Sequence, residues 1–267
     1  MGLQEIIAIE YLSQPEVFAD IFNGVVFGGK QVIKPEELYE TDTRQQFMIA
    51  EQTANHRPQS VEILKKDRDI VREVVMNGQR VRVLACAVEQ QTNVNYIMPL
   101  RMLLYEALEY LKQVQKISRE HEKHKDLHGD EYISRFAKTD KLIPTISIVV
   151  YTGTKPWDGA LELKDLYGGM LRNEELKPYM NQFLGNWRIH LLDVYNVEDT
   201  SVFHSSFRIV LEMLRTSKDA EQLEHYVTEH KTELEELNEI SNRFVSWLLE
   251  IDLELEEEES FLYTINS

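Results

Sequence analysis

The chain opens with a helical pattern of hydrophobic residues. From Pro15 to Phe27, apolar side chains recur at intervals of three and four residues, which is the spacing of one face of an α-helix. Ser13 is followed by Glu16 three residues later, as at many helix starts, and Gly28-Gly29 is a typical stop. The pattern therefore predicts a helix over 15–27 that begins after an N-cap at Ser13.

Shorter apolar runs with β-branched residues follow. A run that opens at Asp67 and a second run over 81–88 flank Asn77-Gly78, a dipeptide that favours a two-residue hairpin turn. Strands separated by helices indicate an α/β domain with a mixed sheet. The remaining elements of that domain are a helix over 99–116 and strands within 142–151 and 187–195.

Other stretches lack this periodicity. Residues 39–60 are polar, and 55–60 are expected to be a loop. Residues 118–141 are highly charged and are expected to be an exposed connection. After Ser201 the pattern is helical as far as about Leu255. These features divide the chain into an α/β domain over 1–200 and an acidic helical extension over 201–267.

The charge is unevenly distributed. The 267 residues carry a formal net charge of −17, which disfavours nucleic-acid binding because such binding depends on neutralising phosphates. However, residues 219–259 contribute −13, so the rest of the chain is close to neutral and can form a local basic groove. Apolar residues inside 219–259 recur at helical spacing, which predicts amphipathic helices that pack on the α/β domain or form a dimer contact. We hypothesise that their acidic face repels DNA, so that truncation near Thr216 raises DNA affinity. The alternative is a solvated cap that has no effect on DNA binding.

Several classes of protein are disfavoured by what the chain lacks. No apolar stretch approaches the ~20 residues that a membrane-spanning helix needs, and the N-terminus has no signal-peptide pattern. A single cysteine, Cys86, excludes an intrachain disulfide. Phosphate-binding, dinucleotide-binding, nucleophile-elbow and Cys-x-x-Cys motifs are also missing. These observations predict a cytoplasmic protein with no membrane association.

The candidate chemistry lies at the ends of the predicted hairpin. Asp69 precedes its first strand, while Glu89 and Gln91 end its second strand. Carboxylates at the end of a buried strand are costly unless they are paired or bind a cation, and hard oxygen ligands suit Mg²⁺. The simpler interpretation is a strand that becomes polar as it leaves the core.

The order Asp69…Glu89-x-Gln91 resembles the PD-(D/E)XK nuclease superfamily, in particular its recombination-promoting nuclease (Rpn) or transposase-like family. The resemblance extends over residues 12–195. It is carried also by Phe18-Ala19-Asp20, Asp42-Thr43, the run from Asn95 through Arg101 to Tyr105, Tyr151-Thr152-Gly153 and Trp157.

This resemblance implies a restriction-endonuclease-like mixed sheet flanked by helices, and a Mg²⁺-dependent DNA endonuclease in which Mn²⁺ can substitute. It implies that Asp69 and Glu89 bind the metal and that Gln91 positions the attacking water or the phosphate. Asp20 is an accessory metal ligand or, alternatively, part of an exposed acidic helix face. Basic residues are the candidate phosphate contacts, although they can equally be solvated or ion-paired, and they are Lys65, Lys66, Arg68 and Arg101.

Two substitutions and the strand register complicate the resemblance. Arg68 stands in place of the superfamily's Pro, and Gln91 replaces a Lys, so that a charge is missing. A two-residue turn at Asn77-Gly78 also places Asp69 opposite Cys86 and hence on the other sheet face from Glu89. These departures favour an alternative, a DNA- or protein-binding regulator on a nuclease scaffold. For either function, the expected partners are DNA and, through the C-terminal helices, a second copy of the chain.

One further pattern is open to two interpretations. His121, His124 and His128 lie three and four residues apart, so on a helix they could bind a transition metal. The surrounding Lys and Glu residues and Gly129 favour a solvated loop instead. Trp157, next to Pro156, is interpreted as a packing anchor and not as a platform for stacking bases.

Overall fold

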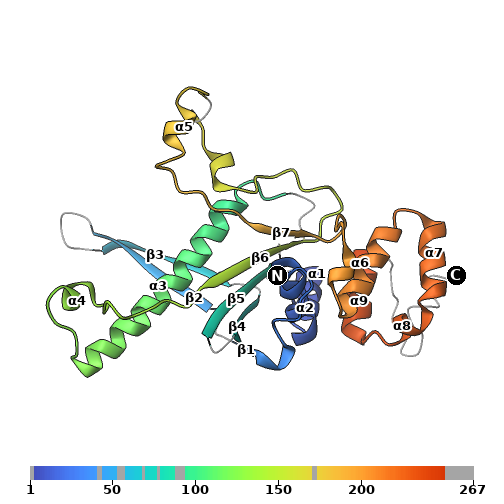
Figure 1. The fold of residues 1–267 in the computed structure, drawn as a ribbon, viewed down its shortest axis with the longest axis horizontal. Coiled ribbons are helices and arrows are strands. Elements are labelled where there is room, and N and C mark those ends of the chain that lie inside the picture. Colours follow the sequence, from blue (N-terminus) through green and yellow to red (C-terminus); the bar gives the residue numbers. More distant parts are fainter. Residues whose placement is uncertain are drawn as a thin grey trace.

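A computed structural model (Figure 1) describes residues 3–40, 44–52, 58–67, 70–76, 79–87, 94–169 and 173–249. The prediction of an α/β fold is confirmed. Its centre is a five-stranded mixed sheet in the order β1-β4-β5-β6-β7. These strands are β1 (Leu38–Glu40), β4 (Ile70–Met76), β5 (Gln79–Ala87), β6 (Thr145–Tyr151) and β7 (His190–Asp193).

The hairpin register agrees with the sequence prediction. Met76 pairs with Gln79, and the antiparallel ladder continues to Ile70 opposite Ala85. Strands β5, β6 and β7 are parallel to one another, so long crossover connections join them. The carboxyl ends of these three strands and the amino end of β4 therefore lie at one edge of the sheet.

Helices α1 (Leu3–Leu12) and α2 (Pro15–Phe27) cover one face of the sheet. The predicted bounds of α2 are confirmed, and Gly28 closes the helix at φ 60°, a conformation that glycine adopts readily. The predicted N-cap is wrong. Gln14 occupies that position without a side-chain cap, while the Ser13 hydroxyl donates backwards to the carbonyl of Ile9.

The opposite face carries the long helix α3 (Met98–His124). Met98, Met102 and Tyr105 pack there against Val71 of β4, Val149 of β6 and Ile189. Ile70, Val74, Ile148 and Val150 point instead into the core formed with α1 and α2, as expected from the alternation of side chains along strands. The domain is thus a three-layer α/β/α sandwich (Figure 1).

Helix α3 is longer than its apolar pattern predicted, because it continues through the charged segment beyond Lys116 to His124. The short helix α4 (Gly129–Ser134) follows. Most residues of 118–141 are solvent-exposed, as expected. The expectation that they form an irregular connection is wrong, because much of this segment is helical.

The C-terminal segment is helical, as predicted, and packs against α1 and α2 (Figure 1). The Tyr11 ring stacks on Phe244 with the two ring centroids 4.3 Å apart. The apolar faces of these helices are therefore buried within the chain, and a dimer through them stays a prediction. The helices are α6 (Ser206–Thr216), α7 (Ala220–Glu229), α8 (Lys231–Glu235) and α9 (Glu239–Leu248).

Two segments project from the sandwich in Figure 1. The first is an antiparallel ribbon of β2 (Arg44–Gln52) and β3 (Pro58–Asp67). The loop expected over 55–60 is wrong for 58–60, which belong to β3, and its other residues lie outside the described residues. The second, here called the arm, comprises residues 160–187 with the short helix α5 (Lys177–Met180). Among the described residues, no helix has the length and apolar character needed to cross a membrane.

Candidate functional site

The candidate site is the sheet edge where β5, β6 and β7 end and β4 begins. Ile70 pairs with Ala85 at this edge, and Ala87 pairs with Val150 of β6. Ile70 directly follows Asp69 in the chain, and Ala87 precedes Glu89 by two residues. The described strand ends that flank the two predicted metal ligands thus lie together. Open α/β sheets commonly bind ligands outside the carboxyl ends of their strands.

An aromatic cluster borders this edge at the end of β6. The Tyr151 hydroxyl donates to the carbonyl of Lys155 at 2.9 Å, and its ring meets Trp157 edge-on at 5.1 Å. Trp157 Nε1 donates to the carbonyl of Gly159 at 3.0 Å. Trp157 also packs on the cluster that contains Met98, as the prediction of a packing anchor requires. These contacts hold the loop that follows β6 in one conformation.

Negatively charged side chains lie close to the two tyrosines of this loop region. Tyr96 donates to Asp158 at 3.4 Å, and the Asp158 charge raises the pKa of Tyr96. Burial, followed by the charges of Asp193 and Asp158, raises the pKa of Tyr151. Both phenols therefore stay protonated at neutral pH and act as hydrogen-bond donors.

Arg101 supplies positive charge near the start of α3. Its Nη2 donates to the Tyr105 hydroxyl at 3.2 Å, and the guanidinium lies 5.9 Å from the centroid of the same ring. Its buried Nε has no hydrogen-bond partner, and no ion pair of Arg101 occurs among the described residues. Tyr105 packs against Val71, two residues after Asp69. Arg101 thus brings to the candidate edge a positive charge that has no ion-pair partner among the described residues.

Comparison with known proteins assigns the chain to a family. The family model described as "Putative transposase, YhgA-like" matches residues 62–244, which include the hairpin, α3, β6, β7 and most of the C-terminal helices. The chain belongs to this family. No curated protein and no solved structure matches it. Membership in the YhgA-like family agrees with the transposase-like resemblance found in the sequence.

Asp20 occupies a different environment from the one predicted for an exposed acid. It is 3% exposed and accepts hydrogen bonds from the backbone N–H groups of His204 and Ser205 at 2.8–2.9 Å. The Ser205 hydroxyl donates to it at 2.7 Å. The carboxylate therefore anchors the chain just before α6, where a negative charge also stabilises the helix N-terminus. The alternative of an exposed helix face is wrong, while metal ligation by Asp20 stays a prediction.

The other predicted site residues are described less completely. Asp69, Glu89, Gln91 and Arg68 lie outside the described residues. Lys65 and Lys66 lie on β3, opposite Gln46 and Gln45, and their side chains lie outside the described atoms. Among the residues that the structure does describe, no three His, Cys, Asp or Glu side chains form a group that could hold a metal ion.

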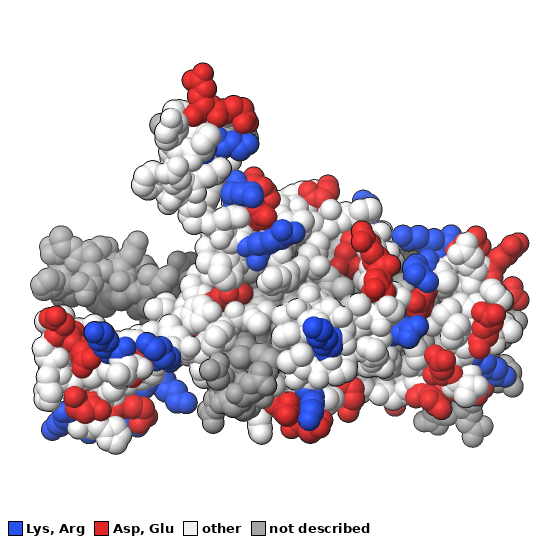
Figure 2. Space-filling view, viewed as in Figure 1, with Lys and Arg blue, Asp and Glu red and all other residues white. Residues whose placement is uncertain are grey.

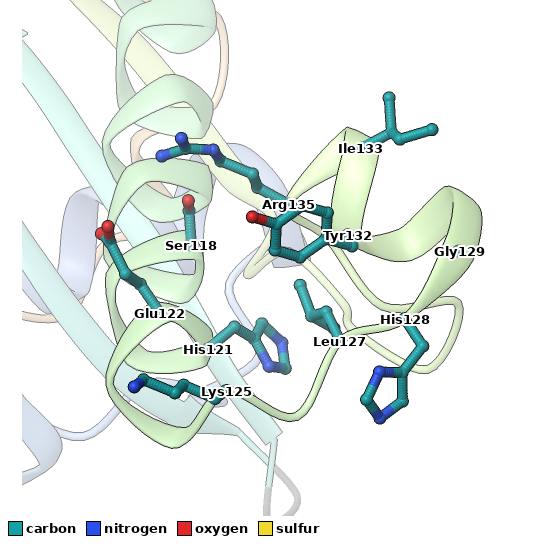
Figure 3. Close-up of a pocket in the computed structure, with 10 residues that line it drawn as sticks. All are labelled: Ser118, His121, Glu122, Lys125, Leu127, His128, Gly129, Tyr132, Ile133 and Arg135. Carbon is teal, nitrogen blue, oxygen red and sulfur yellow. The ribbon is translucent and has the colours of Figure 1, made fainter.

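The predicted transition-metal site of His121, His124 and His128 is therefore wrong, since all three residues are described and form no such group. His121 instead donates to two carboxylates, with Nδ1 2.8 Å from Asp126 and Nε2 2.9 Å from Asp140. A neutral imidazole has one N–H, so two such donations require the protonated ring. His121 lies beside a cavity of about 790 Å³ between α3 and α4 (Figure 3), which His128 also lines. The ion pairs close the hairpin formed by these two helices.

We therefore expect the packing of α4 against α3 to loosen as pH rises. Hydrogen bonds to Asp126, and then to Asp140, raise the pKa of His121. The stabilisation is full below the ordinary histidine pKa of about 6.5 and is lost as pH rises through the raised value. NMR titration of the His121 ring should give the raised pKa, and the amide protection factors over 129–140, which are exchange rates corrected for the intrinsic effect of pH, should fall across the same range. His121→Gln should remove the pH dependence of the protection factors, and protection factors over 129–140 that still fall across the same pH range in this variant would contradict the assignment.

Three buried charged side chains were not identified from the sequence. Glu106 and Glu109 are 3% and 2% exposed on the sheet side of α3, and Arg72 is 6% exposed on β4. Arg72 donates to the carbonyl of Ser13 at 2.7 Å, and its guanidinium lies 5.6 Å from the centroid of the Phe18 ring. The helical spacing of the two glutamates with Met102 and Tyr105 could have indicated their burial, since all four share one side of α3.

Proposed function

We propose that the protein is a metal-dependent DNA endonuclease with a restriction-endonuclease-like fold. The observation that carries the proposal is the pairing of Ile70 with Ala85 at the sheet edge, which brings together the strand ends next to Asp69 and Glu89. Family membership and the α/β/α layers also support it. Asp69 and Glu89 would bind the metal and Gln91 would position the attacking water.

The donor set fits Mg²⁺, because two carboxylates and an amide oxygen are hard ligands. When bound, such a metal lowers the pKa of a coordinated water and offsets charge on the phosphate. The Gln91 amide can accept a hydrogen bond from the water and donate one to a phosphate oxygen. Regular alternation beyond the Ile70–Ala85 pair would put Asp69 and Glu89 on opposite faces. The site therefore requires a bulge or an end of pairing beyond that point.

Arg101 and the basic residues near β3 would contact the DNA backbone. Arg101 has no ion-pair partner among the described residues, and a guanidinium can donate two parallel hydrogen bonds to a phosphate. Lys65 and Lys66 lie near the end of β3, and Arg68 lies between β3 and β4 in the chain. Figure 2 shows basic and acidic side chains interspersed over the visible face, so DNA contact would depend on such local groups and not on a uniformly basic surface.

The proposal is tested by incubating the purified protein with plasmid DNA and Mg²⁺ or Mn²⁺. The native chain should nick the plasmid, and Asp69→Ala or Glu89→Ala should reduce nicking by about 10²-fold or more, as expected when a group essential for charge stabilisation is lost. Asp67→Ala is the matched control. Asp67 is a nearby carboxylate that is not a proposed metal ligand, and its backbone pairs with that of Arg44 in the β2–β3 ribbon. Equal nicking by the native and Asp69→Ala chains would refute the proposed site.

A second candidate is a regulator that binds DNA or protein without cleavage. The Gln91 substitution and the hairpin register favour it. Calorimetric titration with Mn²⁺ separates the two candidates, because the nuclease should bind the ion through Asp69 and Glu89. The regulator predicts no ion binding that depends on those residues, together with DNA or protein binding that survives their replacement.

A further inference from the structure

The space between α3 and α4 lies apart from the proposed nuclease site. The candidate edge borders the first turns of α3, whereas the cavity of about 790 Å³ lies beside its last turns (Figure 3). A smaller cavity of about 320 Å³ adjoins the larger one, since Ser118, Glu122 and Arg135 line both. We call the two cavities together the α3–α4 cleft. Its volume lies in the range of small-molecule sites in proteins.

Basic side chains outnumber acidic ones in the α3–α4 cleft. Lys125 and Arg135 line the larger cavity, and Arg119 lines the smaller one with Arg135. One acid, Glu122, is among the lining residues. None of the three cations forms an ion pair with a described residue. Their charges are therefore available to a bound anion.

His121 does not reverse this balance. Its ring forms ion pairs with Asp126 and Asp140, so it is already engaged within the protein. Even when both carboxylates are counted against the protonated ring, positive charge exceeds negative charge in and around the cleft. This local excess contrasts with the net charge of −17 on the whole chain, and it attracts anionic ligands.

Lys125 and Arg135 also share a rare backbone conformation. Their φ angles are 52° and 55°, and no other described residue except glycine has a positive φ. Each residue closes a helix, α3 or α4, at a position where glycine is usual because a Cβ atom is strained there. The helix dipole offsets part of this strain by favouring a cation. The chain thus places two cations in the cleft at positions where glycine would be less strained.

An aromatic ring lies beside these cations. Tyr132 lines the larger cavity together with Leu127, and it is 70% exposed. In Figure 3, the Tyr132 ring and the Arg135 side chain both point from α4 toward α3. A guanidinium and an accessible aromatic face therefore border the same space. An exposed aromatic face of this kind can stack on a planar ring of a ligand.

We propose that the α3–α4 cleft binds a nucleoside 5′-phosphate, either free or at the end of a nucleic-acid strand. The phosphate monoester carries nearly two negative charges, which suits the excess of cations, and Arg135 can donate two parallel hydrogen bonds to it. The base stacks on Tyr132. Glu122 accepts a hydrogen bond from a sugar hydroxyl or a base N–H group. A nucleotide thus matches the cations, the acid and the aromatic ring together, and the inference does not depend on the proposed nuclease activity.

Calorimetric titration of the full chain with adenosine 5′-monophosphate tests the site, with a chelator present so that no metal ion is bound elsewhere. The native chain should bind the nucleotide about tenfold or more tightly than inorganic phosphate, because only the nucleotide has a base to stack. Arg135→Ala should weaken nucleotide binding by about tenfold or more, since charge-assisted hydrogen bonds are lost. Lys116→Ala is the matched control, because Lys116 is exposed on α3 but does not line the cleft. It should bind like the native chain.

Tyr132→Ala separates the base contact from the phosphate contact. This variant should bind the nucleotide about tenfold less tightly and inorganic phosphate as the native chain does. Circular dichroism should show the same thermal unfolding for every variant, because the replaced side chains are exposed.

Oligonucleotides with a 5′-phosphate or a 5′-hydroxyl distinguish the two sources of the ligand. If the 5′-phosphorylated strand binds more tightly than the free nucleotide, and Arg135→Ala removes the difference, the ligand is a strand end. Tighter binding of the free nucleotide identifies a soluble ligand. The proposal is overturned if the native chain does not bind the nucleotide, if folded Arg135→Ala binds it equally well, or if inorganic phosphate binds as tightly as the nucleotide.

Discussion

Replacing Asp20 with alanine is expected to destabilise the protein by about 3–5 kcal/mol, because buried donors that lose their acceptor cost about 1–3 kcal/mol each. The carboxylate accepts from the backbone N–H groups of His204 and Ser205 and from the Ser205 hydroxyl. It also ties α2 to the start of α6, and so joins the first and last thirds of the chain. Thermal unfolding should show a Tm about 10 °C lower than that of the native protein.

Asp199→Ala is the matched control for this experiment. Asp199 also caps a short helix, since it accepts from the Ser201 N–H at 2.9 Å, but the bond is exposed and its loss should cost about 1 kcal/mol. Asp20→Asn should have an intermediate effect, because the amide keeps one acceptor oxygen. An unchanged Tm in Asp20→Asn, together with lost Mn²⁺ binding, would instead assign Asp20 to the metal.

Strong periodicity explains which elements could be predicted. The bounds of α2 follow from its apolar spacing and Gly28, and the hairpin register follows from the two-residue connection at Asn77-Gly78. Both signals are local, so they do not depend on distant partners. By contrast, the predicted cap at Ser13 competed with a backward hydrogen bond to Ile9, which spacing alone does not reveal.

Elements with weak or absent periodicity were missed. The strands of the β2–β3 ribbon contain many polar residues, and their backbones pair with each other in an antiparallel ladder. Helix α3 extends past Lys116 because its last turns leave the sheet and need no apolar stripe on that side. Polar segments were therefore taken for loops where the backbone is regular.

The candidate site was predictable in part for a similar reason. Motif order pointed to Asp69, Glu89 and Gln91, which stay predictions, and the ladder places the described strand ends next to Asp69 and Glu89 at one edge. The environment of Asp20 was not predictable, because its partners lie 184 and 185 residues away in the sequence. Long-range hydrogen bonds of this kind leave no periodic signal near the residue that makes them.

Truncation after Thr216 is expected to unfold the protein, and this result would replace the simple gain in DNA affinity predicted from the tail's charge. The truncation removes Phe244, Val245 and Leu248, which are at most 5% exposed in the same core as Tyr11 and Phe18. Loss of one such aromatic residue typically costs about 3–5 kcal/mol, which is comparable to the whole stability of many domains. The truncated chain should therefore lack a cooperative thermal transition, and Phe244→Ala alone should lower the Tm strongly.

The repulsion hypothesis needs a folded variant in which only the charge changes. Six exposed glutamates on and beside α7 and α8 can be changed to glutamine without touching the core, and they are Glu221, Glu224, Glu229, Glu233, Glu235 and Glu236. Such exposed carboxylates contribute little to stability, so the Tm should hardly change. If this surface lies within a Debye length, about 8 Å at physiological salt, of bound DNA, affinity should rise and the gain should shrink as salt increases. A folded neutral variant that binds DNA no better at low salt would leave the C-terminal helices with a structural role alone.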